Sequence, residues 1–317
     1  MELRRLGDTD LEITPLVFGG NVFGWNVGKE DSFRLLDRLL DHGFNAVDTA
    51  DVYSRWADGN SGGESESVLG EWMADRGKRD DLVVITKVGM DMGEGKGGLS
   101  ADWIERAVED SLRRLKTDRI DLYLSHKPDA DTPIEETLEA HQRLIDAGKV
   151  RYAGGSNYDA SGLAEALAAG RAEGRARYQV LQPEFNLYDR DEYKGDLEDL
   201  CVREGLGVIP YFSLAAGFLT GKYRSEDDLG KSAAREGKVK NYLDAKGKRI
   251  LAALDEVAEE TDATPAQISL AWLMERPSVT APIASATSVD QLDELVGAVD
   301  LVLSDDQVAR LDAAGEE

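Results

Sequence analysis

Four side chains that can donate, accept or orient a proton lie far apart in this chain, and each ends or follows an apolar run typical of a strand. They are Asp48, Tyr53, Lys87 and His126. In a barrel of alternating strands and helices, the C-terminal strand ends meet around one mouth, where the active sites of that fold lie. The spacing therefore predicts that a carboxylate, a phenol, an ammonium and an imidazole converge on one proton-transfer site.

These four groups suit the protonation of a carbonyl oxygen as it becomes an alkoxide. A free tyrosine has a pKa of about 10, and a neighbouring ammonium lowers the pKa of a phenol. We therefore expect Lys87 to lower the pKa of Tyr53, while Asp48 keeps Lys87 charged and in place. His126 would hold the substrate oxygen, so Tyr53 is the predicted general acid. This chemistry needs neither a nucleophile nor a metal, and the presence of only three histidines, with no His-x-His pair, argues against a metallohydrolase.

Strand-like and helix-like segments alternate along the chain, which predicts a parallel sheet covered by helices. The predicted strands are Leu16–Gly19, Phe44–Asp48, Leu82–Lys87, Ile120–His126, Arg151–Ser156, Tyr178–Gln182, Gly207–Tyr211 and Thr280–Ala284. The predicted helices are Asp31–His42, Glu64–Arg76, Ala101–Leu115, Ile134–Asp146, Ala160–Ala168, Asp191–Glu204 and Pro265–Glu275, with a further helix start after Ser288. Eight such strands close into a (β/α)8 TIM barrel, so the predicted fold class is α/β.

Three features extend this minimal barrel. A short N-terminal β-hairpin, Leu3–Leu6 against Leu11–Ile13, is expected to plug the barrel bottom. Two extra helices are predicted, around Lys246–Glu260 and Ser304–Ala314. The segment Phe212–Asp244 has little periodicity, and a loop of that length in a compact domain usually has a function.

Length and cysteine content indicate a self-contained protein of a reducing compartment. Residues 1–317 are expected to form a single domain, since no linker or solenoid repeat interrupts the pattern. The one cysteine, Cys201, excludes an internal disulfide and is expected to be buried. The N-terminus lacks the apolar stretch of a secretion signal, and no apolar run reaches the roughly 20 residues that span a bilayer. We therefore expect a cytoplasmic protein.

The chain is unusually acidic, with 62 Asp and Glu against 37 Lys and Arg and a net charge of −25. The acids are scattered and do not form a tail, so they repel both nucleic acid and anionic lipid, and neither is an expected partner. Such a composition is typical of proteins from salt-loving organisms, where salt screens the repulsion between carboxylates. We favour this halophilic interpretation over that of an ordinary acidic cytosolic protein.

The site residues and several longer segments together resemble the aldo-keto reductase family. Its order of Asp, Tyr five residues later, Lys after the next strand and His after the one following fits the four residues named first. Further similar segments run nearly end to end: LGDTDLEITPLVFGGNVFG, NAVDTADVY, ITKVG, IDLYLSHKPD, GGSNY, LQPEFNLYDR, PYFSLAAGFLTGKY and APIASATSVDQLDEL. The resemblance implies a TIM-barrel enzyme that reduces an aldehyde or ketone reversibly by direct hydride transfer from NADP(H) or NAD(H).

The resemblance also implies which residues hold the cofactor, since no strand is followed by the G-x-G-x-x-G motif of a Rossmann fold. Ser156, Asn157 and Gln182 match the polar trio that grips the nicotinamide carboxamide, and Tyr211 matches the aromatic residue that stacks on the ring. The other implied cofactor contacts are Gly20, Asn21, Asp48, Phe212, Ser213, Leu214, Gly217, Lys222, Ser285, Thr287 and Gln291.

Two positions depart from the family's pattern. Thr287 stands where many members carry Arg or Lys against the 2′-phosphate of NADP, and Leu295 stands where many place an Asn on the adenine. Thr287, Ser288 and Gln291 can still hydrogen-bond a phosphate. NADP(H) is therefore the favoured cofactor, with NAD(H) as the alternative.

Four aromatic residues have a structural as well as a functional interpretation. Phe23, Trp25, Trp56 and Phe218 lie in predicted mouth loops, where they either line an apolar substrate pocket or pack against the protein. His141 lies within a helical pattern and is expected on the surface.

Two other functions on the same fold stay open. A cofactor-binding regulatory or redox-sensing protein with little turnover is one, as the potassium-channel β subunits of the family suggest. A phosphate-handling isomerase, which would bind no nicotinamide, is the other. The intact set of four residues favours a reductase acting on a small-molecule carbonyl or alcohol, although a fold alone never decides function.

Overall fold

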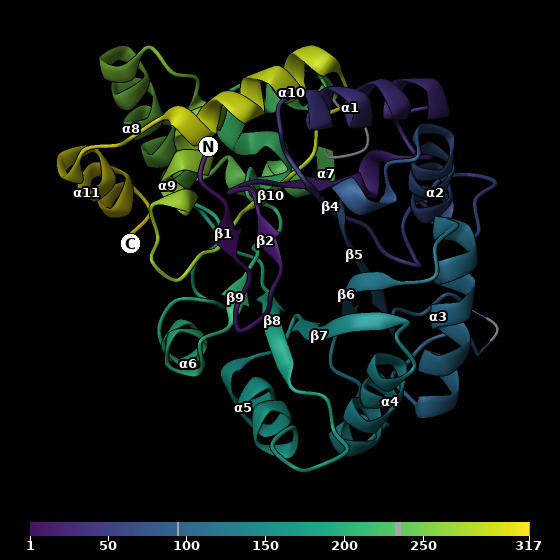
Figure 1. The fold of residues 1–317 in the computed structure, drawn as a ribbon. Coiled ribbons are helices and arrows are strands. Elements are labelled where there is room, and N and C mark those ends of the chain that lie inside the picture. The colour runs from purple at the N-terminus through teal and green to yellow at the C-terminus, as the bar shows by residue number, and fades with distance from the viewer. Residues whose placement is uncertain (94, 232–235, 317) are drawn as a thin grey trace.

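The computed structural model describes residues 1–93, 95–231 and 236–316. Within these ranges a ring of parallel strands lies at the centre, with helices around it (Figure 1). The strands are β3 (Val17–Gly19), β4 (Ala46–Asp48), β5 (Val83–Val88), β6 (Ile120–Ser125), β7 (Val150–Ser156), β8 (Tyr178–Gln182), β9 (Gly207–Val208) and β10 (Ile283–Ala284). They pair in the order β10-β3-β4-β5-β6-β7-β8-β9, which is the α/β TIM-barrel arrangement predicted from the sequence.

Backbone hydrogen bonds join the two ends of this strand order, so the ring closes. Thr280 N donates to Val208 O at 2.8 Å, and Ile283 N donates to Pro210 O at 2.8 Å. Both β9 and β10 are shorter than predicted, because Pro210 and Pro282 lack the N–H groups that a longer ladder requires.

The N-terminal hairpin closes the end of the barrel at which the strands begin. β1 (Arg4–Arg5) pairs antiparallel with β2 (Glu12–Ile13), and the buried Leu6, Leu11 and Ile13 pack against the apolar side chains inside the ring. Gly7 turns the hairpin with φ 62°, where a Cβ would collide with the carbonyl of Gln179 at the start of β8. The predicted plug is confirmed.

Helices cover the outside of the ring in the predicted alternation (Figure 1). They are α1 (Lys29–Asp41), α2 (Glu64–Arg76), α3 (Ala101–Leu115), α4 (Ile134–Asp146), α5 (Ala160–Ala169), α6 (Asp196–Glu204), α9 (Pro265–Met274) and α10 (Val289–Val296). The two appended helices are α8 (Ala245–Thr261) and α11 (Asp305–Ala314). Their ends follow local chemistry: at α9, Thr264 and Gln267 form a capping box, and Pro265 stands at the first helical position.

Short helical turns complete the structure. η1 (Gly20–Val22) follows β3, η2 (Arg79–Asp81) precedes β5, and η6 (Gly297–Asp300) follows α10. The segment after β9, predicted to be irregular, contains η3 (Ala215–Thr220), η4 (Glu226–Lys231), α7 (Glu236–Val239) and η5 (Lys240–Tyr242). Residues 232–235 of that segment lie outside the described residues.

Two local predictions were wrong. Helix α6 begins at Asp196, five residues later than predicted, because Gly195 has φ 91° and ψ −127°, a conformation that no helix contains. His141 is fully buried and not on the surface, with Nε2 lying 3.2 Å from Ser125 Oγ. Burial lowers the pKa of His141 to about 4, so its imidazole is neutral at physiological pH.

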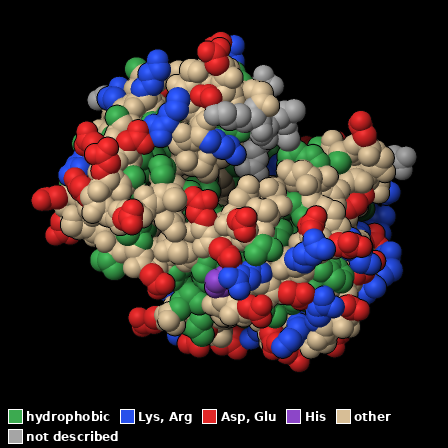
Figure 2. Space-filling model, turned by 90° about the horizontal axis from the view of Figure 1, so that it is seen from above, with side chains coloured by type: hydrophobic (Ala, Val, Ile, Leu, Met, Phe, Trp, Pro, Cys, Tyr) green, Lys and Arg blue, Asp and Glu red, His purple; other side chains and the backbone are tan. Residues whose placement is uncertain are grey.

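The surface carries the acidic charge without concentrating it. On the face that Figure 2 displays, Asp and Glu side chains are spread among Lys and Arg side chains. Many of the acids pair with cations, as Asp293 does with Arg38 at 2.7 Å. No helix within the described ranges combines the length and apolarity needed to cross a bilayer. Cys201 is buried as a free thiol, as predicted.

Candidate active site

Lys87 is the centre of a buried cluster at the C-terminal ends of β4 and β5. It is fully buried, and its Nζ donates to Asp48 Oδ2 at 2.7 Å, to Thr49 O at 2.7 Å and to the Tyr53 hydroxyl at 2.9 Å. The register places Lys87 beside Leu124, two residues before His126. Strand pairing therefore brings together the four residues predicted from the sequence.

The pKa of Tyr53 is shifted in the opposite direction from the one predicted. Burial, followed by the Asp48 carboxylate, raises this pKa well above its usual value of 10.0, so the expected lowering by Lys87 does not prevail. Tyr53 consequently holds its proton at neutral pH. Because its oxygen already accepts from Lys87, the phenol O–H is left to donate, either to Asp48 Oδ2 at 3.4 Å or into the cavity.

His126 lies just past β6 and faces Tyr53. The two ring centroids are 6.0 Å apart with an edge-to-face tilt of 72°. Burial, and then the charges of Lys87 and Lys127, lower the pKa of His126 well below 6.5. The imidazole is therefore neutral at physiological pH and has one N–H with which to hold an oxygen atom.

The polar trio predicted for a carboxamide forms one wall beside this cluster. Ser156 pairs with Gln182 across β7 and β8, and Ser156 Oγ donates to Gln182 O at 2.8 Å. Gln182 Nε2 donates to Asp48 Oδ1 at 2.8 Å, which ties the trio to the ion pair. Asn157 Nδ2 donates to His126 O at 2.8 Å, and Asn157 Oδ1 accepts from the Tyr211 hydroxyl at 2.6 Å.

The sequence reasoning missed two residues here: Lys238, which lines the cavity, and Glu184, which lies behind the wall and pairs with Lys238. Glu184, just after β8, lies 3.0 Å from Lys238 Nζ and accepts from the Tyr211 hydroxyl at 3.4 Å. Lys238, on α7, also lies 3.5 Å above the centroid of the Phe212 ring. Glu184 stands next to a predicted strand end and could have been found there, but Lys238 lies in a segment without periodicity, where no signal marks it.

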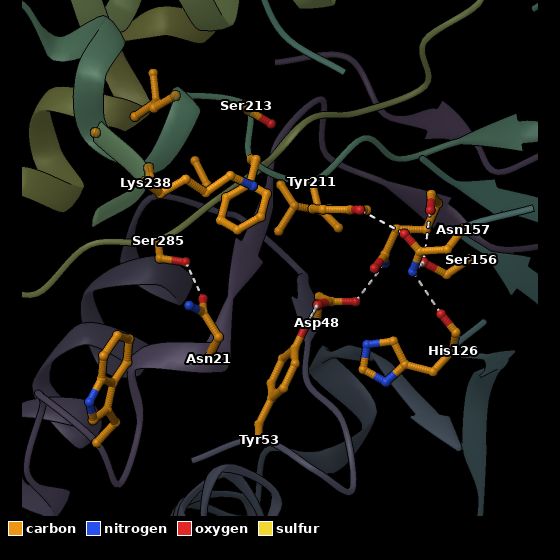
Figure 3. A pocket seen from close by; sticks show the side chains of 18 of the residues that line it. Asn21, Asp48, Tyr53, His126, Ser156, Asn157, Tyr211, Ser213, Lys238 and Ser285 are labelled. Atoms are coloured by element: carbon orange, nitrogen blue, oxygen red, sulfur yellow. Dashed lines mark hydrogen bonds between the residues drawn. The ribbon is translucent and has the colours of Figure 1, made fainter. Parts of the chain in front are cut away.

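These residues surround a cavity of about 740 Å³ (Figure 3). Its lining includes these predicted residues: Asn21, Asp48, Tyr53, His126, Ser156, Asn157, Gln182, Tyr211, Phe212, Ser213, Leu214, Gly217 and Ser285. Gly20 and Lys87 lie directly behind this wall, since Gly20 precedes Asn21 and Lys87 contacts Tyr53. Lys222, Thr287 and Gln291 are exposed and are not part of the lining.

The four mouth-loop aromatics divide into two pairs. Trp25 and Trp56 line the cavity, with ring centroids 5.5 Å apart, and Trp56 lies 5.8 Å from Tyr53. Phe23 and Phe218 are fully buried and pack in the core against Phe18 and Tyr242. The first pair therefore gives the cavity an aromatic end, and the second pair is structural.

The backbone around the cavity is strained in several places. The non-glycine residues Ser54, Asn157, Phe212, Ala215 and Ala216 all have φ between 46° and 73°. Such left-handed conformations cost about 1–3 kcal/mol each and collect at ligand sites. Gly217, at φ 93°, continues this run, so residues 215–217 are all left-handed.

The residues present fit a nicotinamide cofactor. The trio offers both the donors and the acceptors that a primary amide requires, and Tyr211 supplies an aromatic ring between the trio and the 215–217 turn. Ser285 Oγ donates to Asn21 Oδ1 at 2.6 Å, and this pair extends the polar wall of the cavity.

Comparison with known proteins identifies one family. The model of the Aldo/keto reductase family matches residues 15–316. The chain is 35% identical over 320 residues to the uncharacterised oxidoreductase YrpG of Bacillus subtilis (strain 168), covering 98% of this chain and 94% of that one. It is 32% identical to the "Probable voltage-gated potassium channel subunit beta" of Arabidopsis thaliana, covering 95% of this chain and 92% of that one.

A protein named as a reductase is also similar. The norsolorinic acid reductase of Aspergillus flavus is 31% identical over 319 residues, which cover 96% of this chain and 78% of that enzyme. Together with the match to the family model, these relatives show that the chain belongs to the aldo/keto reductase family.

Proposed function

We propose that this protein reduces an aldehyde or ketone to an alcohol, reversibly, with NAD(P)H as the hydride donor. One observation carries the proposal: Lys87 bridges Asp48 and Tyr53 in the wall of a cavity that also contains His126. When bound, the nicotinamide would supply the hydride that reduces the carbonyl carbon. The chain's own residues would supply the proton to the carbonyl oxygen.

In this mechanism Tyr53 is the general acid. Its O–H is directed at the carbonyl oxygen because its lone pairs accept from Lys87, and His126 holds the same oxygen through a neutral imidazole N–H. Asp48 keeps the buried Lys87 charged, and Gln182 fixes the second oxygen of Asp48. Trp25 and Trp56 would cover an apolar part of the substrate.

For the cofactor we propose a modest preference for NADP(H). Ser156, Asn157, Gln182 and Tyr211 would hold the nicotinamide, and residues 212–217 the diphosphate. At the end of the proposed cofactor site away from the nicotinamide, Thr287 Oγ1 donates to Gln291 Oε1 at 2.9 Å. This pair would offer a 2′-phosphate a hydroxyl and an amide, neither of which is charged. Leu295 is buried in the core and offers an adenine nothing polar.

The experiment is a titration of the purified protein with NADPH and NADH, followed by a screen of aldehydes, ketones and sugars by cofactor absorbance. NADPH should bind more tightly than NADH by a few-fold, and at least one carbonyl class should be reduced. Failure to bind either cofactor would contradict the proposed function. Comparable or tighter NADH binding would show that Thr287 reverses the cofactor preference.

A regulatory or redox-sensing role is a second candidate, because relatives at 32% and 32% identity, from Arabidopsis thaliana and Oryza sativa, are named potassium channel β subunits. Cofactor that co-purifies, combined with slow turnover on every carbonyl tested, would favour this role. The cluster around Lys87 supports the enzymatic role, since a sensor without turnover has no need of a positioned acid.

We also propose that the protein works in the cytoplasm, as one domain, at high salt. The net charge of −25 supports the high-salt setting. The salt dependence is tested below.

A further inference from the structure

A second group of buried ionisable side chains lies between β5 and the helices α2 and α3. Glu66 on α2 is fully buried; its Oε1 accepts from Thr86 Oγ1 at 2.6 Å and its Oε2 accepts from Arg114 Nε at 2.7 Å. Thr86 immediately precedes Lys87 in β5, so this group adjoins the catalytic cluster. The mechanism above uses none of its members.

Asp51 belongs to this group and stands out because it has no partner. It is only 2% exposed, and within the described residues neither carboxyl oxygen accepts a hydrogen bond of normal geometry. The backbone amide of Val52 lowers the pKa of Asp51, but it does not donate a hydrogen bond of normal geometry to either carboxyl oxygen. Its own backbone N–H donates to Lys87 O at 3.3 Å, which ties Asp51 to the strand that carries the catalytic lysine. A buried carboxylate without donors is strongly disfavoured relative to the neutral acid.

The charges around Asp51 balance when it is neutral. Asp48 is matched by Lys87, and Glu66 by Arg114; in both acids each oxygen accepts a hydrogen bond. Asp51 has no cation of its own. Burial, followed by the charge of Glu66, raises the pKa of Asp51 to about 8, while Arg114 and Lys87 oppose this rise.

The other titratable group that faces Asp51 is the Tyr123 hydroxyl on β6. It is also buried without a hydrogen-bond partner among the described residues. Burial, and then Asp51, raise the pKa of Tyr123 well above 10.0. Tyr123 therefore stays neutral, and Asp51 is the member of the group that changes its charge near physiological pH.

We propose that Asp51 is a positioning residue that must carry a proton for efficient turnover, because its ionised form would compete for the ammonium of Lys87. This inference rests on the proposed reductase function. The negative charge of ionised Asp51 raises the pKa of Lys87. An ammonium drawn toward Asp51 would stabilise the phenolate less, so the pKa of Tyr53 would rise as well. Since each unit of that rise weakens Tyr53 as an acid tenfold, carbonyl reduction should fall by up to about tenfold as pH rises through about 8.

The first test is the pH profile of kcat for carbonyl reduction in wild type, Asp51→Asn and Asp58→Asn. Asparagine keeps the shape of the neutral acid but cannot ionise, so the alkaline fall near pH ~8 should disappear in Asp51→Asn. Asp58 is an exposed carboxyl in the same loop, and its variant should keep the wild-type profile. A merely structural role for Asp51 would lower kcat equally at every pH, and an unchanged alkaline fall in Asp51→Asn would overturn the proposal.

The second test needs neither turnover nor a variant that folds. Infrared difference spectra of the wild type between about pH 7 and about pH 9 should show loss of the C=O band of one protonated carboxyl group. Absence of that band at neutral pH would overturn the proposal. If the protein reduces no carbonyl but the band titrates, the reductase function fails while the proton on Asp51 stands.

Thermal unfolding of Asp51→Asn beside wild type tests for the same proton. Folded Asp51 keeps its proton up to about pH 8, whereas an unfolded aspartate loses it near 3.9. The folded state binds more protons in that window, so wild-type stability should fall with rising pH relative to a chain without this group. The Tm of Asp51→Asn minus that of wild type should increase from about pH 5 to about pH 8 and then stay constant. A difference independent of pH would contradict a proton on Asp51.

Discussion

The Nζ of Lys87 lies 2.9 Å from the phenol oxygen of Tyr53 and 4.5 Å from the centroid of the same ring. The ammonium thus contacts the tyrosine both at its hydroxyl and over its face. Its remaining two hydrogen bonds go to Asp48 Oδ2 and Thr49 O, both at 2.7 Å. All three ammonium donors are therefore used within the protein, and the position of Tyr53 depends on that of Lys87.

Lys87→Met should destabilise the fold strongly, because it leaves the Asp48 carboxylate buried without its cation. Removing one partner of a buried ion pair costs about 3–5 kcal/mol in the free energy of unfolding. Lys78→Met is the control: Lys78 pairs with Asp81 at 2.6 Å on the surface, and such pairs contribute about 0–1 kcal/mol. Urea unfolding of both variants measures the difference. Similar small losses in the two variants would show that the Lys87 pair is not a buried one.

Lys238→Met should weaken NADPH binding by about five- to tenfold, since it removes a cation from the cavity wall that faces an anionic cofactor. The effect should shrink in high salt, which screens the interaction. Lys240 provides a matched control on the next turn, because it is exposed and lies 3.6 Å from Glu226, away from the cavity. Fluorescence titration gives Kd for each variant, and equal affinities would exclude Lys238 from cofactor binding.

The sequence predicted the barrel and much of the cavity wall because parallel strands align their C-terminal ends. Asp48, Lys87 and Gln182 could be placed together for that reason alone. Their protonation states could not, because the pKa of Tyr53 depends on burial and on the distance to Asp48, which the spacing of residues does not contain.

Sequence reasoning also missed one residue in an irregular segment and misplaced one residue on a helix. Lys238 reaches the cavity from a segment without periodicity, so nothing in the sequence marks it. His141 could have been assigned correctly, since it lies three residues after Leu138 and three before Leu144, on the apolar face of α4.

Molar KCl or NaCl should raise the melting temperature. With a net charge of −25, the folded chain repels itself in dilute buffer. The Debye length falls from about 10 Å at 0.1 M salt to about 3 Å at 1 M, so salt confines each carboxylate's field to its neighbours. The pair of Asp48 and Lys87 is buried and should respond less, so activity should follow the folded fraction. A flat or falling melting temperature between about 0.1 M and several molar KCl would remove the halophilic interpretation.

The most direct test of the account is turnover by Tyr53→Phe, measured beside its affinity for NADPH. Phenylalanine keeps the ring over Lys87 but removes the O–H that the account assigns as the proton donor. The predicted result is a fall in kcat of about 10²–10⁴-fold, with the Kd for NADPH changed by less than about threefold. Undiminished turnover in this variant would contradict the central claim that Tyr53 is the general acid.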